Sequence, residues 1–293
     1  MGKKLNIGGQ ALIEGLMIKS PKFISIGLRL PNNKIKVKVD KYVSLTEKNK
    51  LLKLPFIRGI IILIEMLYIG MKYLIYSSNE QDDEEESLSM FSIITTILIS
   101  LLFALLIFKA VPLFMTTIIG NLFTINNLIF NLIDGILRIF MFIIYIILIS
   151  KMDDVKTLFA YHGAEHATIS CYENNKKLTV DNVSKFSTLH SRCGTSFLVI
   201  TLFISILIFS IVPFNMPYWQ LFIYRLPLVF PIAGVSYEIL KFSSKFSKYW
   251  FFRQVTKPGL LVQKITTKKP NKKQIEVAIK TLKALLKKEK VDY

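Results

Sequence analysis

Four long apolar segments dominate the chain and limit what it can fold into. They are residues 90–108, 127–150, 196–216 and 221–240. A helix needs about 20 apolar residues to cross a hydrocarbon core roughly 30 Å thick. The segments therefore predict two pairs of transmembrane helices in an α-helical integral membrane protein. The fourth segment is the weakest prediction because it contains Arg225, Pro227, Pro231 and Glu238.

Composition supports a membrane protein and argues against a nucleic-acid partner. The chain is 52% hydrophobic with a formal charge of +18, concentrated at its two ends. Residues 1–55 carry twelve Lys and Arg against three Asp and Glu, and residues 241–293 carry fifteen against three. Basic flanks of apolar segments are typical of cytoplasmic loops. The basic residues are not interleaved with an aromatic stacking platform, so we expect the lipid bilayer and no nucleic acid as partner.

The charge pattern also predicts an orientation. Four spans place both termini and the interval 151–195 on one side, which the positive-inside rule makes cytoplasmic. The segment 55–76 is apolar but carries Arg58, Glu65 and Lys72 seven residues apart, on one side of a helix. We expect an amphipathic interfacial helix there, because a fifth span would put the basic N-terminus outside. The start of the chain has no apolar signal peptide, so we expect a multi-pass protein of the cell membrane.

The segments outside the spans divide into smaller units. Residues 1–54 predict a soluble module in which 23–44 form a β-hairpin around the turn PNN, preceded by a turn-rich lead-in, GGQALIEGLMIKSP. Residues 77–89 predict an acidic linker. The tail, 241–293, predicts an extended stretch after Pro258 and then an amphipathic helix that docks on the hairpin module or the bilayer surface. Its apolar stripe consists of Ile275, Ala278, Ile279, Leu282 and Leu285.

All three histidines and both cysteines lie between Tyr161 and Gly194. The stretch 153–173 predicts a helix, in which the HxxEH pattern of YHGAEHATISCYE places His162 and His166 one turn apart. Two imidazoles at this spacing can reach one metal ion. The pattern is the reverse of the zinc-peptidase helix motif, in which Glu polarises a water molecule. We therefore assign Glu165 the role of catalytic base.

The second half of the predicted site is HSRC at the entrance to the third span. His190 and Cys193 in this irregular turn can close on the same cation, and a set of N and S ligands favours zinc among the transition metals. We expect this loop to form a cytoplasmic metal site. Cys171 points to the opposite side of the helix and is expected to be a small buried residue. Three further polar residues could support the ligands: Glu173, Glu14 and Gln10.

The motifs together resemble a known family. The stretches GGQALIEGLM, PFIRGIIILIEML, YHGAEHATISCYE, HSRCGTSF and PGLLVQKITTKKP are similar to those of the YqhQ-like multi-pass membrane proteins. That family is a domain family of unknown function, described as predicted metal-dependent enzymes. The resemblance implies a membrane protein with a metal site at the matching His, Glu and Cys positions, but no substrate. Ala167 departs from the Lys expected in many relatives, which weakens a mechanism needing a cation beside His166.

Three functions follow as hypotheses. The first is a membrane hydrolase that acts on a peptide or lipid-linked group at the cytoplasmic face, with Glu165 as general base. The second is a scaffold or assembly factor in which four ligands form a closed, structural zinc site. The third, a transporter, is weaker because the spans offer few facing charges.

Overall fold

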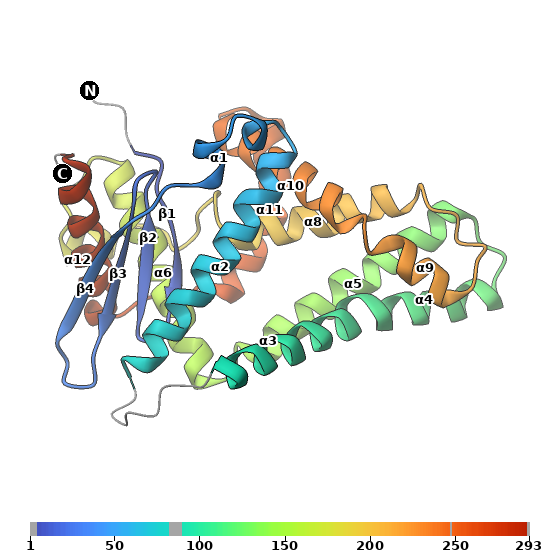
Figure 1. Ribbon diagram of the computed structural model, residues 1–293, viewed down its shortest axis with the longest axis horizontal. Helices are drawn as coiled ribbons and strands as arrows, with labels where there is room; N and C mark the ends of the chain where they lie inside the picture. Colours follow the sequence, from blue (N-terminus) through green and yellow to red (C-terminus); the bar gives the residue numbers. More distant parts are fainter. Residues whose placement is uncertain (1–4, 82–89, 247, 292–293) are drawn as a thin grey trace.

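The computed structural model describes residues 5–81, 90–246 and 248–291, so most of the predicted acidic linker lies outside the described residues. A four-stranded antiparallel sheet opens the chain, and its strands pair in sequence order (Figure 1). Its strands are β1 (Gly8–Leu12), β2 (Gly15–Lys19), β3 (Phe23–Arg29) and β4 (Ile35–Lys41). The predicted hairpin is confirmed as β3 and β4, which pair along their whole length.

The expectation of a turn-rich lead-in before this hairpin is wrong. GGQALIEGLMIKSP forms a second hairpin, β1 and β2, closed by Ile13 and Glu14. Glu14 adopts a φ of 48°, a left-handed conformation that is uncommon for residues other than Gly, Asn and Asp. Because the turn lacks the usual Asn-Gly or Asp-Gly signal, the sequence pattern does not show the hairpin.

Helices cover both faces of the sheet. On one face α2 (Ile57–Asn79) packs Ile69 and Tyr73 against Met17 and its neighbours. On the other face α6 (Asp153–Glu173) and α12 (Lys272–Glu289) pack against Leu16 and Ile18. Side chains alternate between the two faces of a strand, so adjacent residues of β2 serve opposite layers. Figure 1 shows the resulting three layers, with the sheet between α2 and the α6–α12 pair.

The predicted amphipathic tail helix is α12, and it packs on the sheet. Its five stripe residues are all buried in the core shared with β2, β3 and α6. Asn271 and Gln274 form a reciprocal capping box at its first turn, which satisfies two backbone N–H groups. The last helix of the chain therefore completes the layer that carries the HxxEH motif.

Truncating Leu282 tests this docking. Leu282 is fully buried, so Leu282→Ala is expected to lower the free energy of unfolding by about 2–5 kcal/mol through lost burial and a residual cavity. Lys280→Ala, at an exposed position on the same helix, should change it by less than about 0.5 kcal/mol. Chemical denaturation of the purified full chain measures both. Equal effects of the two substitutions would contradict the packing described.

The apolar segments form helices whose lengths differ from those expected. Within the described residues, three helices are long and apolar enough to cross a membrane, or up to four if a bent pair counts as one span. The three are Ile57–Asn79, Ile94–Leu122 and Asn127–Ile149. Such helices are consistent with membrane association. The first is the segment expected to be interfacial; its C-terminal half packs on the sheet.

The first apolar helix is longer than the expected span 90–108 and ends at Leu122. The helix continues from α3 (Met90–Leu105) through a π-turn, η2 (Leu106–Ala110), into α4 (Val111–Leu122). Pro112 lies directly after the π-turn, in which the Val111 N–H donates to the Leu106 oxygen five residues back, so the helix continues past the proline. The second expected span matches α5 (Asn127–Ile149).

The second expected pair is shorter and broken. The helix expected over 196–216 is α8 (Gly194–Phe209), which has 16 residues and spans about 24 Å at 1.5 Å per residue. The helix expected over 221–240 breaks into α9 (Tyr218–Arg225) and α10 (Val229–Lys245), bent by 47°. The break falls at Pro227, where the backbone cannot donate a helical hydrogen bond.

The extended stretch expected after Pro258 is also wrong. Pro258 lies inside α11 (Trp250–Thr266), and only the five residues before α12 are extended. Gly259, the next residue, packs directly on Ser196 of α8, where a side chain would clash. This close packing holds α11 against α8. Three short elements complete the order: α1 (Leu45–Lys48), η1 (Leu51–Lys53) and α7 (Val180–Val183).

Candidate metal centre

Helix α6 carries the HxxEH motif into the interior of the protein. The expected helix and its bounds, Asp153–Glu173, agree with the structure. Small residues along α6 let other backbone segments approach closely; a side chain at Gly163 would meet the carbonyl of Lys268. As a result Glu165 and His166 are only 3% and 2% exposed. Polar groups buried this deeply require hydrogen-bonding or ionic partners.

Three of the predicted ligands come together. Ligand atoms of His162, His166 and Cys193 all lie within 4.8 Å of one another. The His162 Nε2 atom is 3.2 Å from the Cys193 Sγ atom, and the two imidazole centroids are 4.3 Å apart. Cys193 arrives from the other half of the motif because it caps the first turn of α8. We call these three residues the ligand cluster.

The two histidines of the ligand cluster are oriented from behind by backbone carbonyls. The Nδ1 atom of His162 lies 2.9 Å from the Thr266 oxygen, and that of His166 lies 2.6 Å from the Thr188 oxygen. A carbonyl only accepts, so both Nδ1 atoms carry a proton, and in the neutral imidazole this tautomer leaves the lone pair on Nε2. This arrangement fixes the tautomer of metal-binding histidines. The Nε2 atom of each ring is therefore the one oriented to bind a cation.

Burial sets the protonation of the cluster. It lowers the pKa of His166 to about 3, with the neighbouring imidazole of His162 acting in the same direction. It raises the pKa of the Cys193 thiol to about 11. At neutral pH His166 is thus neutral, as a metal ligand must be, whereas Cys193 releases a proton when a metal binds.

Glu165 faces the same point as the ligand cluster. Its Oε2 atom lies 3.4 Å from the His166 Nε2 atom. Burial raises the pKa of its carboxyl, and the imidazoles of His162 and His190 oppose that shift. A buried carboxylate is stabilised by a nearby cation. The structure thus puts the predicted base beside the group that could hold a metal.

Strand β1 holds Glu165 in this position. The Gly9 backbone N–H donates to the Glu165 carboxylate. A Cβ atom at Gly9 would lie within 3.0 Å of both the Glu165 side chain and the Met17 carbonyl oxygen. Only glycine lets the strand approach the carboxylate this closely.

Adding a methyl group at Gly9 is therefore expected to disturb the site. Gly9→Ala should lower the free energy of unfolding by about 1–3 kcal/mol through overpacking. The neighbouring Gly8→Ala adds its methyl group to open space, with nothing within 4 Å, and should change stability by less than about 0.5 kcal/mol. Thermal denaturation of the two variants measures the difference. Equal stability of the Gly9→Ala and Gly8→Ala variants would contradict the close packing of strand β1 on Glu165.

His190 does not join the ligand cluster. Its Nε2 atom faces the Glu173 carboxylate at 3.3 Å, and Glu173 also pairs with Arg192. Gln263, which is fully buried in α11, accepts from the His190 N–H and donates to the His190 carbonyl oxygen, both at 2.9 Å. The clamp fixes the backbone of His190. Although the His190 ring is outside the ligand cluster, its centroid lies only 5.6 Å from that of the His166 ring.

The other predicted supporting residues lie apart from the cluster. Gln10 points to the opposite face of the sheet, against Gly70 of α2. Glu14 accepts a hydrogen bond from the Tyr161 hydroxyl at 3.3 Å and has no recorded contact with a ligand among the described residues. Cys171 is buried and its thiol faces the carbonyls of Lys176 and Lys177, in agreement with a packing role.

Several residues that shape the site could not be assigned to it from the sequence. Gln263 and Thr266 lie in the stretch expected to be extended, and the sequence gives no reason to place that stretch near the motif. Gly9 carried a usable signal, because paired glycines permit close backbone approach. Gly9 approaches the side chain of Glu165, which is 156 residues away in the sequence, so residue spacing does not identify the contact.

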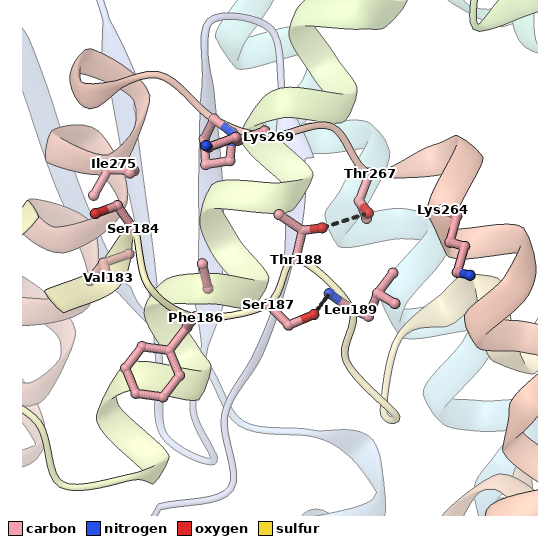
Figure 2. Close-up of a pocket in the computed structure, with 12 residues that line it drawn as sticks. Val183, Ser184, Phe186, Ser187, Thr188, Leu189, Lys264, Thr267, Lys269 and Ile275 are labelled. Atoms are coloured by element: carbon pink, nitrogen blue, oxygen red, sulfur yellow. Dashed lines mark hydrogen bonds between the residues drawn. The ribbon is translucent and has the colours of Figure 1, made fainter. Parts of the chain in front are cut away.

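A pocket of about 410 Å³ lies beside the ligand cluster (Figure 2). Thr188 connects the two: its side chain lines the pocket and accepts a hydrogen bond from Thr267, and its carbonyl accepts from His166. Lys264 and Lys269 are among the lining residues labelled in Figure 2, and none of the twelve lining residues is acidic. The pocket lining is therefore positively charged.

Comparison with known proteins places the chain in a family. A family model described as "Protein of unknown function (DUF1385)" matches residues 54–288, which include every element from α2 to nearly the end of α12. The chain belongs to this family. It is 33% identical over 298 residues to the Bacillus subtilis (strain 168) protein described as "Uncharacterized protein YqhQ", covering 95% of this chain and 92% of that protein. The resemblance to YqhQ-like proteins is thus confirmed, and neither description assigns an activity. No solved structure gives a significant match.

Proposed function

We propose that this chain is a zinc-dependent membrane hydrolase that acts at the cytoplasmic face of the cell membrane. The observation that carries the proposal is the ligand cluster of His162, His166 and Cys193 with a buried carboxylate beside it. Three protein ligands are typical of catalytic zinc sites, whereas structural sites use four. Imidazole and thiolate ligands favour zinc over magnesium or calcium.

The residues divide the work as follows. The two imidazoles and the thiolate hold the ion, and the carbonyls of Thr266 and Thr188 keep the rings in place. When bound, zinc polarises water and a substrate oxygen. Glu165 accepts a proton from the attacking water and returns it to the leaving group. The Gly9 N–H holds the carboxylate in reach of the reacting atoms.

The proposed membrane placement rests on the charge distribution. The apolar helices would cross the bilayer, with both basic ends and the ligand cluster on the cytoplasmic side. The substrate would then be a peptide or a lipid-linked group near that surface. The positively charged pocket beside the cluster supports a substrate that carries negative charge.

A structural zinc site is the second candidate because His190 lies close to the cluster. A turn of its ring toward His166 would supply a fourth ligand and close the site. The protein would then act as a membrane scaffold or assembly factor. The ring's contact with Glu173 and the clamp by Gln263 favour the first candidate.

Cobalt substitution separates the two candidates. Cobalt(II) in the full-length protein should show visible d–d bands and a sulfur-to-metal charge-transfer band that disappears in Cys193→Ser. Added azide or a small hydroxamate should change the d–d bands, since a catalytic site accepts an exogenous ligand. A cobalt spectrum that no added ligand changes, but that His190→Ala does change, would instead establish the closed structural site.

A further inference from the structure

Four ionisable side chains lie buried together among the apolar helices, outside the metal centre. Lys109 comes from η2, Asp134 and Arg138 from α5, and Arg225 from the end of α9. Their exposed fractions are 9%, 1%, 6% and 1% in that order. We call them the buried cation cluster. Ionisable residues in such helices are rare because their desolvation is costly, and they commonly mark functional sites.

Contacts between the helices hold the cluster together. The Asp134 Oδ2 atom accepts from Arg138 and, at 2.9 Å, from Arg225. Arg225 also donates to Asn131 at 2.5 Å. The ring of Phe209 contacts all three cations: its centroid is 5.6 Å from Lys109, 5.0 Å from Arg138 and 4.9 Å from Arg225.

The charges within the cluster do not balance. Three cations face one carboxylate, and Lys109 interacts electrostatically with both arginines and Asp134. Among the described residues, the Lys109 Nζ atom has no hydrogen-bond partner although it is shielded from solvent. The Nε atoms of Arg138 and Arg225 are also unpartnered, as is the Oδ1 atom of Asp134. Buried donors and charges left without partners are strongly destabilising, which indicates that an anion completes the cluster.

We propose that the buried cation cluster binds a phosphate group. A phosphate monoester carries between one and two negative charges at neutral pH, which matches the excess of two positive charges. Its oxygens accept several charge-assisted hydrogen bonds, the kind that arginine and lysine donors make best. A ligand with a single carboxylate group carries one negative charge and would neutralise only half of the excess positive charge.

The backbone around Lys109 supports a binding role. Leu106–Ala110 form a π-turn within an otherwise α-helical segment, and single π-turns are frequent at functional sites. The Tyr218 hydroxyl of α9 donates to the carbonyl of Ala110 at 3.1 Å, which ties this turn to the helix that carries Arg225. The outer faces of α4 and α5 expose large apolar side chains, so a phosphate carried by an amphiphile can approach along them.

Binding to the purified full-length protein in neutral detergent tests the proposal. Phosphatidic acid, a phosphate monoester, should raise the melting temperature of the wild type, and phosphatidylcholine should not. Lys109→Met should weaken phosphatidic acid binding by about tenfold or more, the effect of losing one charge-assisted contact. Inorganic phosphate in millimolar amounts is the second arm. If inorganic phosphate also raises the melting temperature, and if this rise depends on Lys109, free phosphate is the ligand. If inorganic phosphate does not raise the melting temperature, the lipid phosphate is the ligand.

The basic surface of the chain demands a matched control. Lys72→Met makes the same change on an exposed lysine of α2 and should leave phosphatidic acid binding at the wild-type level. Equal binding by Lys109→Met and Lys72→Met would overturn the proposal. If Lys109→Met does not fold, native mass spectrometry of the wild type decides. Selective retention of phosphatidic acid over phosphatidylcholine supports the site, and equal retention of the two overturns it.

Discussion

Replacing His162 with alanine is expected to lower the zinc content of the purified protein from about one atom per chain to less than about a tenth. His162 supplies one of three ligands, and its Nε2 atom lies 3.2 Å from the Cys193 Sγ atom. Losing even a residue that only orients a ligand commonly weakens metal binding by 10–100-fold, and losing a ligand should do more. Elemental analysis after purification in chelator-free, zinc-supplemented buffer measures the content.

His190→Ala is the matched control for that experiment. Its ring faces Glu173, so this variant should keep its zinc. Equal loss of zinc from His162→Ala and His190→Ala would show that His190 turns toward the ion and closes the site. Wild-type zinc content in His162→Ala would contradict the whole ligand assignment.

Glu165→Gln is expected to separate zinc binding from catalysis. The amide keeps the shape of the side chain beside His166 but cannot accept the proton from water. Zinc content should stay within about threefold of the wild type, while hydrolysis should fall by about 10²–10⁴-fold, the usual contribution of a general base. A panel of chromogenic esters, phosphodiesters and fluorogenic peptides measures the zinc-dependent rate.

The control for this prediction lies on the same helix. Asp153 is exposed at the start of α6, and Asp153→Asn should leave the hydrolysis rate unchanged. A zinc-dependent rate that Glu165→Gln does not reduce would remove Glu165 from the mechanism. It would leave the ion and its ligands in place as the remaining candidates for catalysis.

Local patterns account for what the sequence predicted well. Helix α6 follows from acidic residues at its start and the absence of proline, and the i, i+4 spacing brings His162 and His166 together without tertiary information. The stripe on α12 follows from helical periodicity in the same way. Such features depend on residues within a few turns of one another.

Features fixed by distant contacts could not be predicted. The backbone of His190 is held by Gln263, which lies 73 residues away in a helix that contains a proline. The turn at Glu14 adopts a backbone conformation that its residue type rarely selects. The buried cation cluster gathers charges from three separate helices, each of which offered too few charges to suggest a site.

X-ray absorption of the zinc-loaded, full-length protein tests the central claim most directly, because it counts the atoms around the ion. We predict one sulfur at about 2.3 Å and three nitrogen or oxygen atoms at about 2.0–2.1 Å, two of them from imidazole rings. This ligand set corresponds to Cys193, His162 and His166 with one exchangeable position. A spectrum with three imidazoles and one sulfur would contradict the catalytic site, and one without sulfur would contradict the ligand cluster itself.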